Sequence, residues 1–222
     1  MRIKSALFIG LNVIIAGCGG GDGGAVDSTS SQIEASTCFG AQLFEPGARY
    51  TITTRKNNID SVQSALVKSA QFRGQDVIEQ HNENTGDSLY VTVDSTNKSY
   101  FILGGISASQ EWYYLPPSRN AFDMKLGDTD SDTYTMISGA EQFVYDVSNK
   151  FVGMEVITIA AGTFNTCKFE YSTTVTLPSG EKRSLSSERW VLSGYGIAIK
   201  TVANGETTEL VSGIVNGESI SN

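Results

Sequence analysis

Histidine is nearly absent from this sequence of 222 residues, in which His81 is the only one. A metal site built from several histidines is therefore excluded, and any Ser–His or Cys–His nucleophile would have to use His81. Basic residues are also scarce, since 16 Lys and Arg stand against 24 Asp and Glu for a formal charge of −8. This acidic balance offers no positive field for phosphates, so we expect no nucleic-acid binding.

Long apolar runs are missing as well, because no segment after residue 17 approaches the roughly 20 apolar residues that a spanning helix needs. The start of the chain has the pattern of a signal peptide, with Arg2 and Lys4 before an apolar segment at 6–15. The segment runs into Ile-Ala-Gly-Cys at 15–18, which resembles a bacterial lipobox. We therefore predict a lipoprotein signal peptide over residues 1–17 and lipidation at Cys18. An ordinary signal peptide that ends near a cysteine is the alternative.

The lipobox resemblance implies a location in the bacterial cell envelope. Two or three acyl chains would anchor the protein firmly, at about 0.8 kcal/mol per buried methylene. Gly19 stands where an aspartate usually marks retention in the inner membrane, so the resemblance favours the outer membrane. Residues 18–37 comprise Cys18 and a Gly/Ser-rich stretch, which predicts a lipidated residue followed by a flexible tether.

Cysteine is limited to three residues. With Cys18 assigned to the lipid, Cys38 and Cys167 remain as a pair in a chain sent to an oxidising compartment, and we predict a disulfide between them. Loop closure over this separation would contribute about 4 to 5 kcal/mol as an upper guide. A redox or catalytic thiol is the alternative, but neither a Cys-x-x-Cys spacing nor a neighbouring histidine supports it.

Segments in which apolar and polar residues alternate are abundant in this chain. From Arg49 onward, short alternating segments recur about every ten residues with turn signals between them. Asn204-Gly205 is the clearest hairpin, since a type I′ turn needs positive φ at both central residues. Residues 59–71 fit a strand or a helix, and we favour the strand.

These patterns predict an all-β fold in a single domain over residues 38–222. We expect one antiparallel, strongly curved sheet of about ten to twelve strands, arranged as a half-barrel, an open barrel or a sandwich. At most one short helix is expected.

Two motifs, in this order, carry a family resemblance: ITIAAGTFNTCKFE at 157–170 and RWVLSGYGIAIKT at 189–201. With LFEPGARYTI at 43–52, FRGQDVIEQ at 72–80 and the Pro-Pro segment at 114–134, they resemble an uncharacterised family of bacterial periplasmic and lipoprotein β domains. That family is related in shape to curved half-barrels such as the Lol-type lipoprotein carriers. Ala161 and Ser193 differ from the residues that the family usually has at these positions. The resemblance implies a fold and an envelope location, and no activity.

An acidic segment, GDTDSDTY, is the first candidate for a site. Its Asp128, Asp130 and Asp132 suggest calcium, but an EF-hand loop would need glycine and glutamate where Thr133 and Gly139 stand. We interpret the segment as a solvated turn, with a calcium site of another type as the alternative.

The second candidate site surrounds the single histidine. On an alternating strand His81 would share a face with Glu79 and Glu83, which could form a weak metal site. A surface histidine between hydrated carboxylates is the preferred interpretation. Because no carboxylate pair or Gly-x-Ser-x-Gly motif stands out, we predict no catalytic residue, no metal and no cofactor.

Together, these observations predict a non-enzymatic binding or assembly module that is anchored in the bacterial envelope. Its expected partners are the membrane, through the lipid anchor, and either a lipid-like hydrophobic ligand on the concave face of the sheet or an envelope protein at its edge. The alternative is a hydrolase that acts on envelope polysaccharide through carboxylates, with or without calcium.

Overall fold

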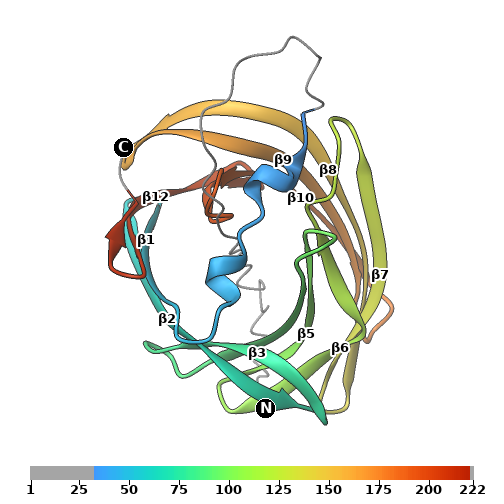
Figure 1. The fold of residues 1–222 in the computed structure, drawn as a ribbon. Helices are drawn as coiled ribbons and strands as arrows, with labels where there is room; N and C mark the ends of the chain where they lie inside the picture. The colour runs from blue at the N-terminus through green and yellow to red at the C-terminus, as the bar shows by residue number, and fades with distance from the viewer. Residues whose placement is uncertain (1–32, 221–222) are drawn as a thin grey trace.

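The computed structural model describes residues 33–220, which form a β-barrel (Figure 1). Strands β1 to β12 each pair antiparallel with the next, and β12 pairs with β1 to close the ring. The strands are β1 Arg49–Lys56, β2 Ile59–Phe72, β3 Gln75–Asn82, β4 Ser88–Asp94, β5 Ser99–Ser107, β6 Gln110–Ala121, β7 Thr129–Ser138, β8 Glu141–Ile159, β9 Gly162–Thr176, β10 Lys182–Leu192, β11 Ala198–Ala203, β12 Glu206–Val215 and the short β13 Glu218–Ser219, which pairs with β12. Within the described residues, no helix has the length and apolarity to cross a membrane.

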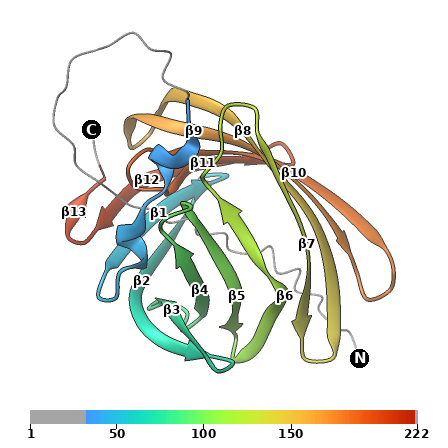
Figure 2. The ribbon, with the colours of Figure 1, turned by 45° about the vertical axis from the view of Figure 1, so that its right-hand side comes forward.

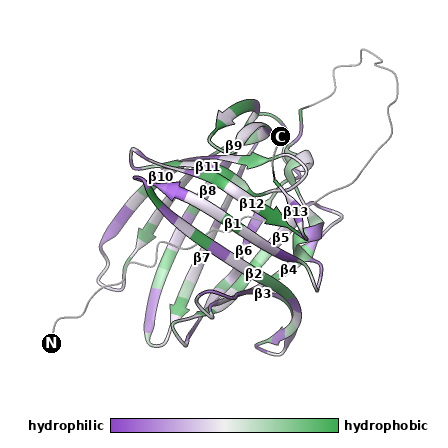
Figure 3. Ribbon diagram, turned by 90° about the vertical axis from the view of Figure 1, so that its left-hand side faces the viewer, coloured by the Kyte–Doolittle hydropathy of each residue, from purple (hydrophilic) through white to green (hydrophobic). Residues whose placement is uncertain are grey.

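Local sequence signals explain most of these strands. Residues 59–71 lie in β2, so the strand interpretation is confirmed. Asn204 and Gly205 have φ values of 52° and 78°, as the predicted hairpin turn requires. Outward and inward residues alternate in hydropathy along the strands, which is visible as green and purple bands in Figure 3.

The all-β antiparallel fold class is confirmed. The sheet is a closed barrel and not the half-barrel or open form, because its first strand pairs with β12. Closure joins β1 to β12 from Tyr50↔Val215 to Lys56↔Thr208. Tyr50, Ile52, Leu210 and Val215 are all buried at this seam, so apolar burial accompanies the closing hydrogen bonds. Closure leaves few free strand edges.

An N-terminal segment enters one end of the barrel (Figures 1 and 2). We call residues 33–48 the plug; it contains two 3₁₀ helices, η1 Ala35–Cys38 and η2 Ala41–Phe44. The Ala35 N–H donates to the Met124 carbonyl at 2.9 Å, and Ala35 and Cys38 are fully buried. The expected tether at 18–37 therefore overlaps packed structure in its last residues. Cys18 and the predicted signal peptide lie outside the described residues.

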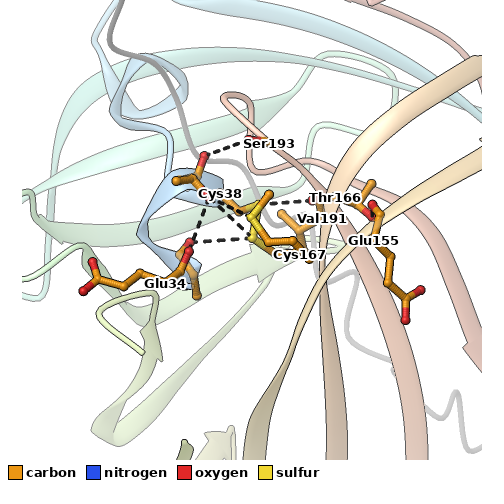
Figure 4. Close-up of a disulfide and its surroundings, with 10 residues drawn as sticks. Glu34, Cys38, Glu155, Thr166, Cys167, Val191 and Ser193 are labelled. Carbon is orange, nitrogen blue, oxygen red and sulfur yellow. Dashed lines mark hydrogen bonds between the residues drawn. A yellow bond between two sulfur atoms is a disulfide. The ribbon is translucent and has the colours of Figure 1, made fainter. Parts of the chain in front are cut away.

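The predicted disulfide between Cys38 and Cys167 is present and fastens the plug to β9 (Figure 4). The two Cα atoms are 6.2 Å apart and the bond spans 129 residues of sequence. Near it, the Gly194 N–H donates to the Thr37 carbonyl at 2.9 Å, and the Ser193 hydroxyl donates to the same oxygen at 3.4 Å. Covalent and hydrogen bonds therefore hold the plug in one place.

Aromatic residues fill the plugged end around this bond. Phe151 and Phe169 are fully buried, with ring centroids 5.4 Å apart, and Phe122 lies 5.6 Å from Phe169. Phe39 from the plug reaches Phe122 at 5.8 Å. Phe39 belongs to the plug inside the barrel, and Phe151 and Phe169 on β8 and β9 pack into the same cluster. The faces of β8 and β9 that carry Phe151 and Phe169 therefore point inward.

The outer face carries a tryptophan flanked by charges. Trp190 is in register with Lys168 on β9 and Lys200 on β11, whose ammonium groups lie 4.8 and 5.5 Å from its ring centroid. Its indole N–H donates to Glu155 at 2.7 Å. Since Trp190 alternates with the inward Val191, its side chain lies on the outer side of the wall, where its neighbours leave only 7% of it exposed.

Candidate binding surface inside the barrel

Beyond the plug, strands β8 to β10 extend well past the aromatic cluster, and the hairpins that join β7 to β8 and β9 to β10 project from the unplugged end (Figure 2). Alternation from Phe151 and Phe169 places a series of large side chains on the inner wall of this end. All are half-buried, so part of each side chain remains accessible. We call this set the open inner surface: Trp112, Tyr114, Tyr145, Val147, Tyr171 and Val175.

Two tyrosines of this surface, Tyr114 and Tyr145, pack against the buried Tyr134 on the strand between them. The Tyr134 ring on β7 lies 4.5 Å from Tyr114 on β6 and 5.3 Å from Tyr145 on β8, between ring centroids. Trp112 meets Tyr114 edge-on at 5.2 Å. Such contacts contribute about 0.5 to 1.5 kcal/mol each beyond area burial, which makes this part of the wall rigid.

Trp112 reaches its position because the neighbouring strand has no side chain there. A Cβ built on Gly105 would lie 2.7 Å from Cζ2 of the Trp112 ring, which is closer than real contacts allow. Gly105 faces Trp112 directly in the β5–β6 register. The glycine is therefore required for the indole to lie flat against the inner wall.

The environment of these tyrosines shows in their pKa values. Burial raises the pKa of Tyr114 and Tyr171 above the usual 10.0, and raises that of Tyr134 to about 12. Tyr114 and Tyr171 nevertheless keep accessible surface. Both are thus largely surrounded by protein and still keep some accessible surface.

Arg189 lies on the inward face of β10. It is in register with the inward Phe169, and its guanidinium carbon lies 4.2 Å from the centroid of the Tyr171 ring. Its charge lowers the pKa of Tyr100, Tyr134 and Tyr171, against the larger effect of burial, although these residues lie on three different strands. Arg189 therefore occupies a central position where the plugged and open ends meet.

Among the described residues, Arg189 is also the only arginine that has no carboxylate partner. The other arginines bind Asp or Glu at 2.6 to 3.0 Å: Arg49, Arg55, Arg73, Arg119 and Arg183. Across the β8–β9 register from Tyr171, the buried side-chain oxygen of Asn149 lacks a hydrogen-bond partner. Among the described residues, the interior therefore contains a guanidinium without a carboxylate and an amide oxygen without a hydrogen-bond donor.

Alkaline titration should report the tyrosine environment. Below pH 10 the folded and unfolded chains both keep these phenols protonated, so the stability from their burial is fully present. Between pH 10 and about 12 the unfolded chain loses protons that Tyr134 retains, so stability falls as pH rises. We expect most tyrosinate absorbance to appear together with loss of near-UV circular dichroism above pH 11, about one unit past the usual phenol value. Full, reversible tyrosinate formation in the folded protein at pH 10 to 11 would contradict this.

The aspartates of the predicted turn have another role. Asp130 and Asp132 belong to β7, so the interpretation of the whole segment as a solvated turn is wrong. The pairing of β6 with β7 stops at Leu115↔Thr135, and Arg119 fills the gap beyond it. Arg119 donates to Asp130 at 2.9 Å from its side chain and to Asp132 at 3.2 Å from its backbone N–H.

The third aspartate accepts a hydrogen bond in the adjoining loop, from the Lys125 N–H to Asp128 at 2.9 Å. Burial is the largest effect on Asp130 and raises its pKa, although Arg119 opposes it. The three carboxylates thus bind donors of the chain itself. Within residues 33–220, no group of three His, Cys, Asp or Glu side chains is arranged to hold a metal ion.

Only one of the two glutamates expected beside the histidine stays there: Glu79 Oε1 lies 3.5 Å from His81 Nδ1. Strand β3 ends at Asn82, so Glu83 leaves the expected face and its carboxylate binds Arg49 at 2.7 Å. His81 Nδ1 lies 3.1 Å from the Ser88 hydroxyl, which donates to Glu79 at 2.7 Å. The predicted common face for all three residues is wrong because the chain turns after the histidine.

Sequence reasoning did not single out the open inner surface or Arg189. Alternation correctly placed Tyr171 on the face of Cys167, and the same rule would have placed Arg189 with Val191. What it could not supply was the convergence of β5, β7 and β9 around one arginine, because these strands meet through barrel curvature and not through adjacent sequence.

Comparison with known proteins finds fold similarity only. Neither a protein-family model nor a curated protein sequence matches the chain. Among solved structures, a proposed exported protein with a YmcC-like fold from Bacteroides fragilis is 13% identical, covers 75% of this chain and 95% of its own, and has a TM-score of 0.43. A proposed lipoprotein from Parabacteroides distasonis is 14% identical, with coverages of 76% and 95% and a TM-score of 0.44. The hypothetical lipoprotein YmcC of Escherichia coli is 12% identical, with coverages of 84% and 89% and a TM-score of 0.42.

Proposed function

We propose that this chain is a lipid-anchored, non-enzymatic lipoprotein of the bacterial envelope whose barrel binds a lipid-like ligand on the open inner surface. The anchor rests on the lipobox-like residues 15–18 and the preceding signal-peptide pattern. The ligand rests on one structural observation: large aromatic and aliphatic side chains on the inner wall are only half-buried. Partly apolar concave surfaces of this kind are typical of small-molecule sites.

The barrel interior is a better candidate than a sheet edge. Addition of a partner strand needs an exposed row of backbone N–H and C=O groups. Pairing of β1 with β12 uses the edges that an open sheet would have offered. The envelope-protein version of the hypothesis therefore has less support than the ligand version.

The hydrolase alternative draws on one observation, the raised pKa of Asp130 near Asp123 and Asp132. Raised carboxyl pKa values are common at catalytic sites. Here, however, Asp123 and Asp130 both bind Arg119, which bridges the gap between β6 and β7. A structural role accounts for the cluster, so we favour the binding module.

The anchor has a direct test. Cys18→Ala should abolish incorporation of labelled palmitate and move the protein from the membrane pellet to the soluble periplasmic fraction, because the thiol that carries the lipid is gone. Gly19→Asp is the matched control, which should keep the label and shift the protein toward the inner membrane. Unchanged membrane association of Cys18→Ala would overturn the anchor assignment.

The ligand can be sought by native mass spectrometry of the mature protein, purified gently from its own membrane. We expect a population with a noncovalent added mass that contains an acyl chain and is lost on denaturation. Detection of the unliganded mass alone, together with no uptake of added amphiphiles, would count against a lipid-like ligand.

A further inference from the structure

Arg189 is an unmatched cation within an acidic chain. The protein carries a formal charge of −8, and every other described arginine binds a carboxylate. A guanidinium that is surrounded by protein loses part of its hydration, and without a counter-charge no ion pair compensates for that loss. The Tyr171 ring, at 4.2 Å, offsets part of that loss through a cation–π contact.

We propose that Arg189 recognises the headgroup of the ligand, and that the open inner surface selects single-chain amphiphiles with a monoanionic carboxylate. The proposal rests on the proposed binding function and adds the chemical class of the ligand. A planar guanidinium donates two parallel hydrogen bonds to a carboxylate, which gives both orientation and affinity.

The surroundings of Arg189 suit such a headgroup. Tyr134 and Tyr171 lie within reach of its charge. The Tyr171 oxygen accepts a hydrogen bond from Arg189 and the Tyr134 oxygen accepts one from Ser118, so each protonated phenol keeps its own O–H to donate to an anion. Val147 and Val175 line the wall toward the open end, and Leu185, on the same inner face of β10, is 42% exposed. An acyl chain that lies along them would bury this apolar area while its carboxylate meets Arg189.

The charge inventory favours a carboxylate over a phosphate-bearing headgroup. One arginine supplies a single positive charge at this position, and it is the only unpaired arginine among the described residues. The surplus of acidic side chains elsewhere would repel a second negative charge on the ligand. A monoanion therefore matches the site best.

Calorimetric titration with decanoate, decyl phosphate and decanol, each below its aggregation concentration, tests this selectivity. For the intact mature protein we expect decanoate to bind at least about tenfold more tightly than decanol, because only the carboxylate can pair with the guanidinium. Decyl phosphate should bind more weakly than decanoate. Tighter binding of decyl phosphate would overturn the choice of carboxylate.

Variants then assign the selectivity to the residue. Arg189→Met should lower decanoate affinity about tenfold or more and leave decanol affinity unchanged. Arg55→Met is the matched control: it lies on β1, outside the open inner surface, is about half exposed and binds Asp60, so it should behave like the unmodified protein. Should Arg189→Met unfold, Arg189→Lys keeps the charge without the planar fork and should retain part of the preference.

The outcomes separate the two proposals. If the unmodified protein binds decanol and decanoate equally, the headgroup inference is overturned and the proposed lipid-binding function stands. If it binds none of the three probes, the proposed function itself fails, and this inference fails with it.

Discussion

Replacing both Cys38 and Cys167 with alanine should lower the free energy of unfolding by about 4 to 5 kcal/mol, the largest single effect that we expect. The bond closes a loop that spans 129 residues of sequence, so its loss releases much chain entropy in the unfolded state. Both cysteines are fully buried, and the smaller side chains would also leave a void beside Val191. Denaturant unfolding of the oxidised protein and the variant measures the difference.

A matched control separates the covalent bond from its hydrogen-bonded surroundings. Ser193→Ala removes the weak bond from the Ser193 hydroxyl to the Thr37 carbonyl, 3.4 Å long, and leaves the disulfide intact. It should cost no more than about 1 kcal/mol. A double-alanine variant as stable as this control would show that the plug is held without the disulfide.

Phe169→Ala should destabilise the protein by about 3 to 5 kcal/mol. The ring is fully buried and meets Phe122, Phe151 and Tyr171 at centroid distances between 5.4 and 6.2 Å. Its removal leaves a cavity where the plugged and open ends meet, and the surrounding rings are too constrained to fill it. The same denaturant measurement gives the change.

Leu185→Ala is the control for this substitution, because Leu185 lies on the same inner wall and is 42% exposed. Little area is lost there, so we expect a change below about 1 kcal/mol. Equal losses for the two variants would mean that the open end is packed as tightly as the plugged end. That result would remove the basis for an open inner surface.

The parts of the fold that depend on local chemistry could be predicted from the sequence. Alternation identified strands, including β2 at the ambiguous residues 59–71, and it placed Tyr171 on the face of Cys167. The Asn204-Gly205 turn followed from backbone preferences. The disulfide followed from counting cysteines in an exported chain.

Closure and the plug could not be predicted in the same way. The seam pairs Tyr50 with Val215, and nothing in either strand specifies so distant a partner. Residues 34–37 continue a serine-rich stretch, yet Ala35 and Thr37 form backbone hydrogen bonds with Met124 and Gly194. Composition suggested a tether there, and tertiary packing overrode it.

The candidate site was hidden for a related reason. Sequence proximity drew attention to His81 with its flanking glutamates, whereas the turn after Asn82 leaves only Glu79 beside the histidine and takes Glu83 to Arg49. Arg189 becomes informative only when the other arginines are seen to have carboxylate partners. That comparison requires side-chain positions, which one-dimensional patterns do not contain.

The two tryptophans allow the most direct test of a ligand inside the barrel. Trp112 lies on the open inner surface and Trp190 lies on the outer face, so Trp190→Phe and Trp112→Phe each leave a single reporter on one side of the wall. Titration with a neutral, brominated decanol should quench the fluorescence of the Trp190→Phe protein strongly and saturably, and leave the Trp112→Phe protein nearly unchanged. Quenching of Trp190 alone, or of both tryptophans equally, would contradict binding within the barrel.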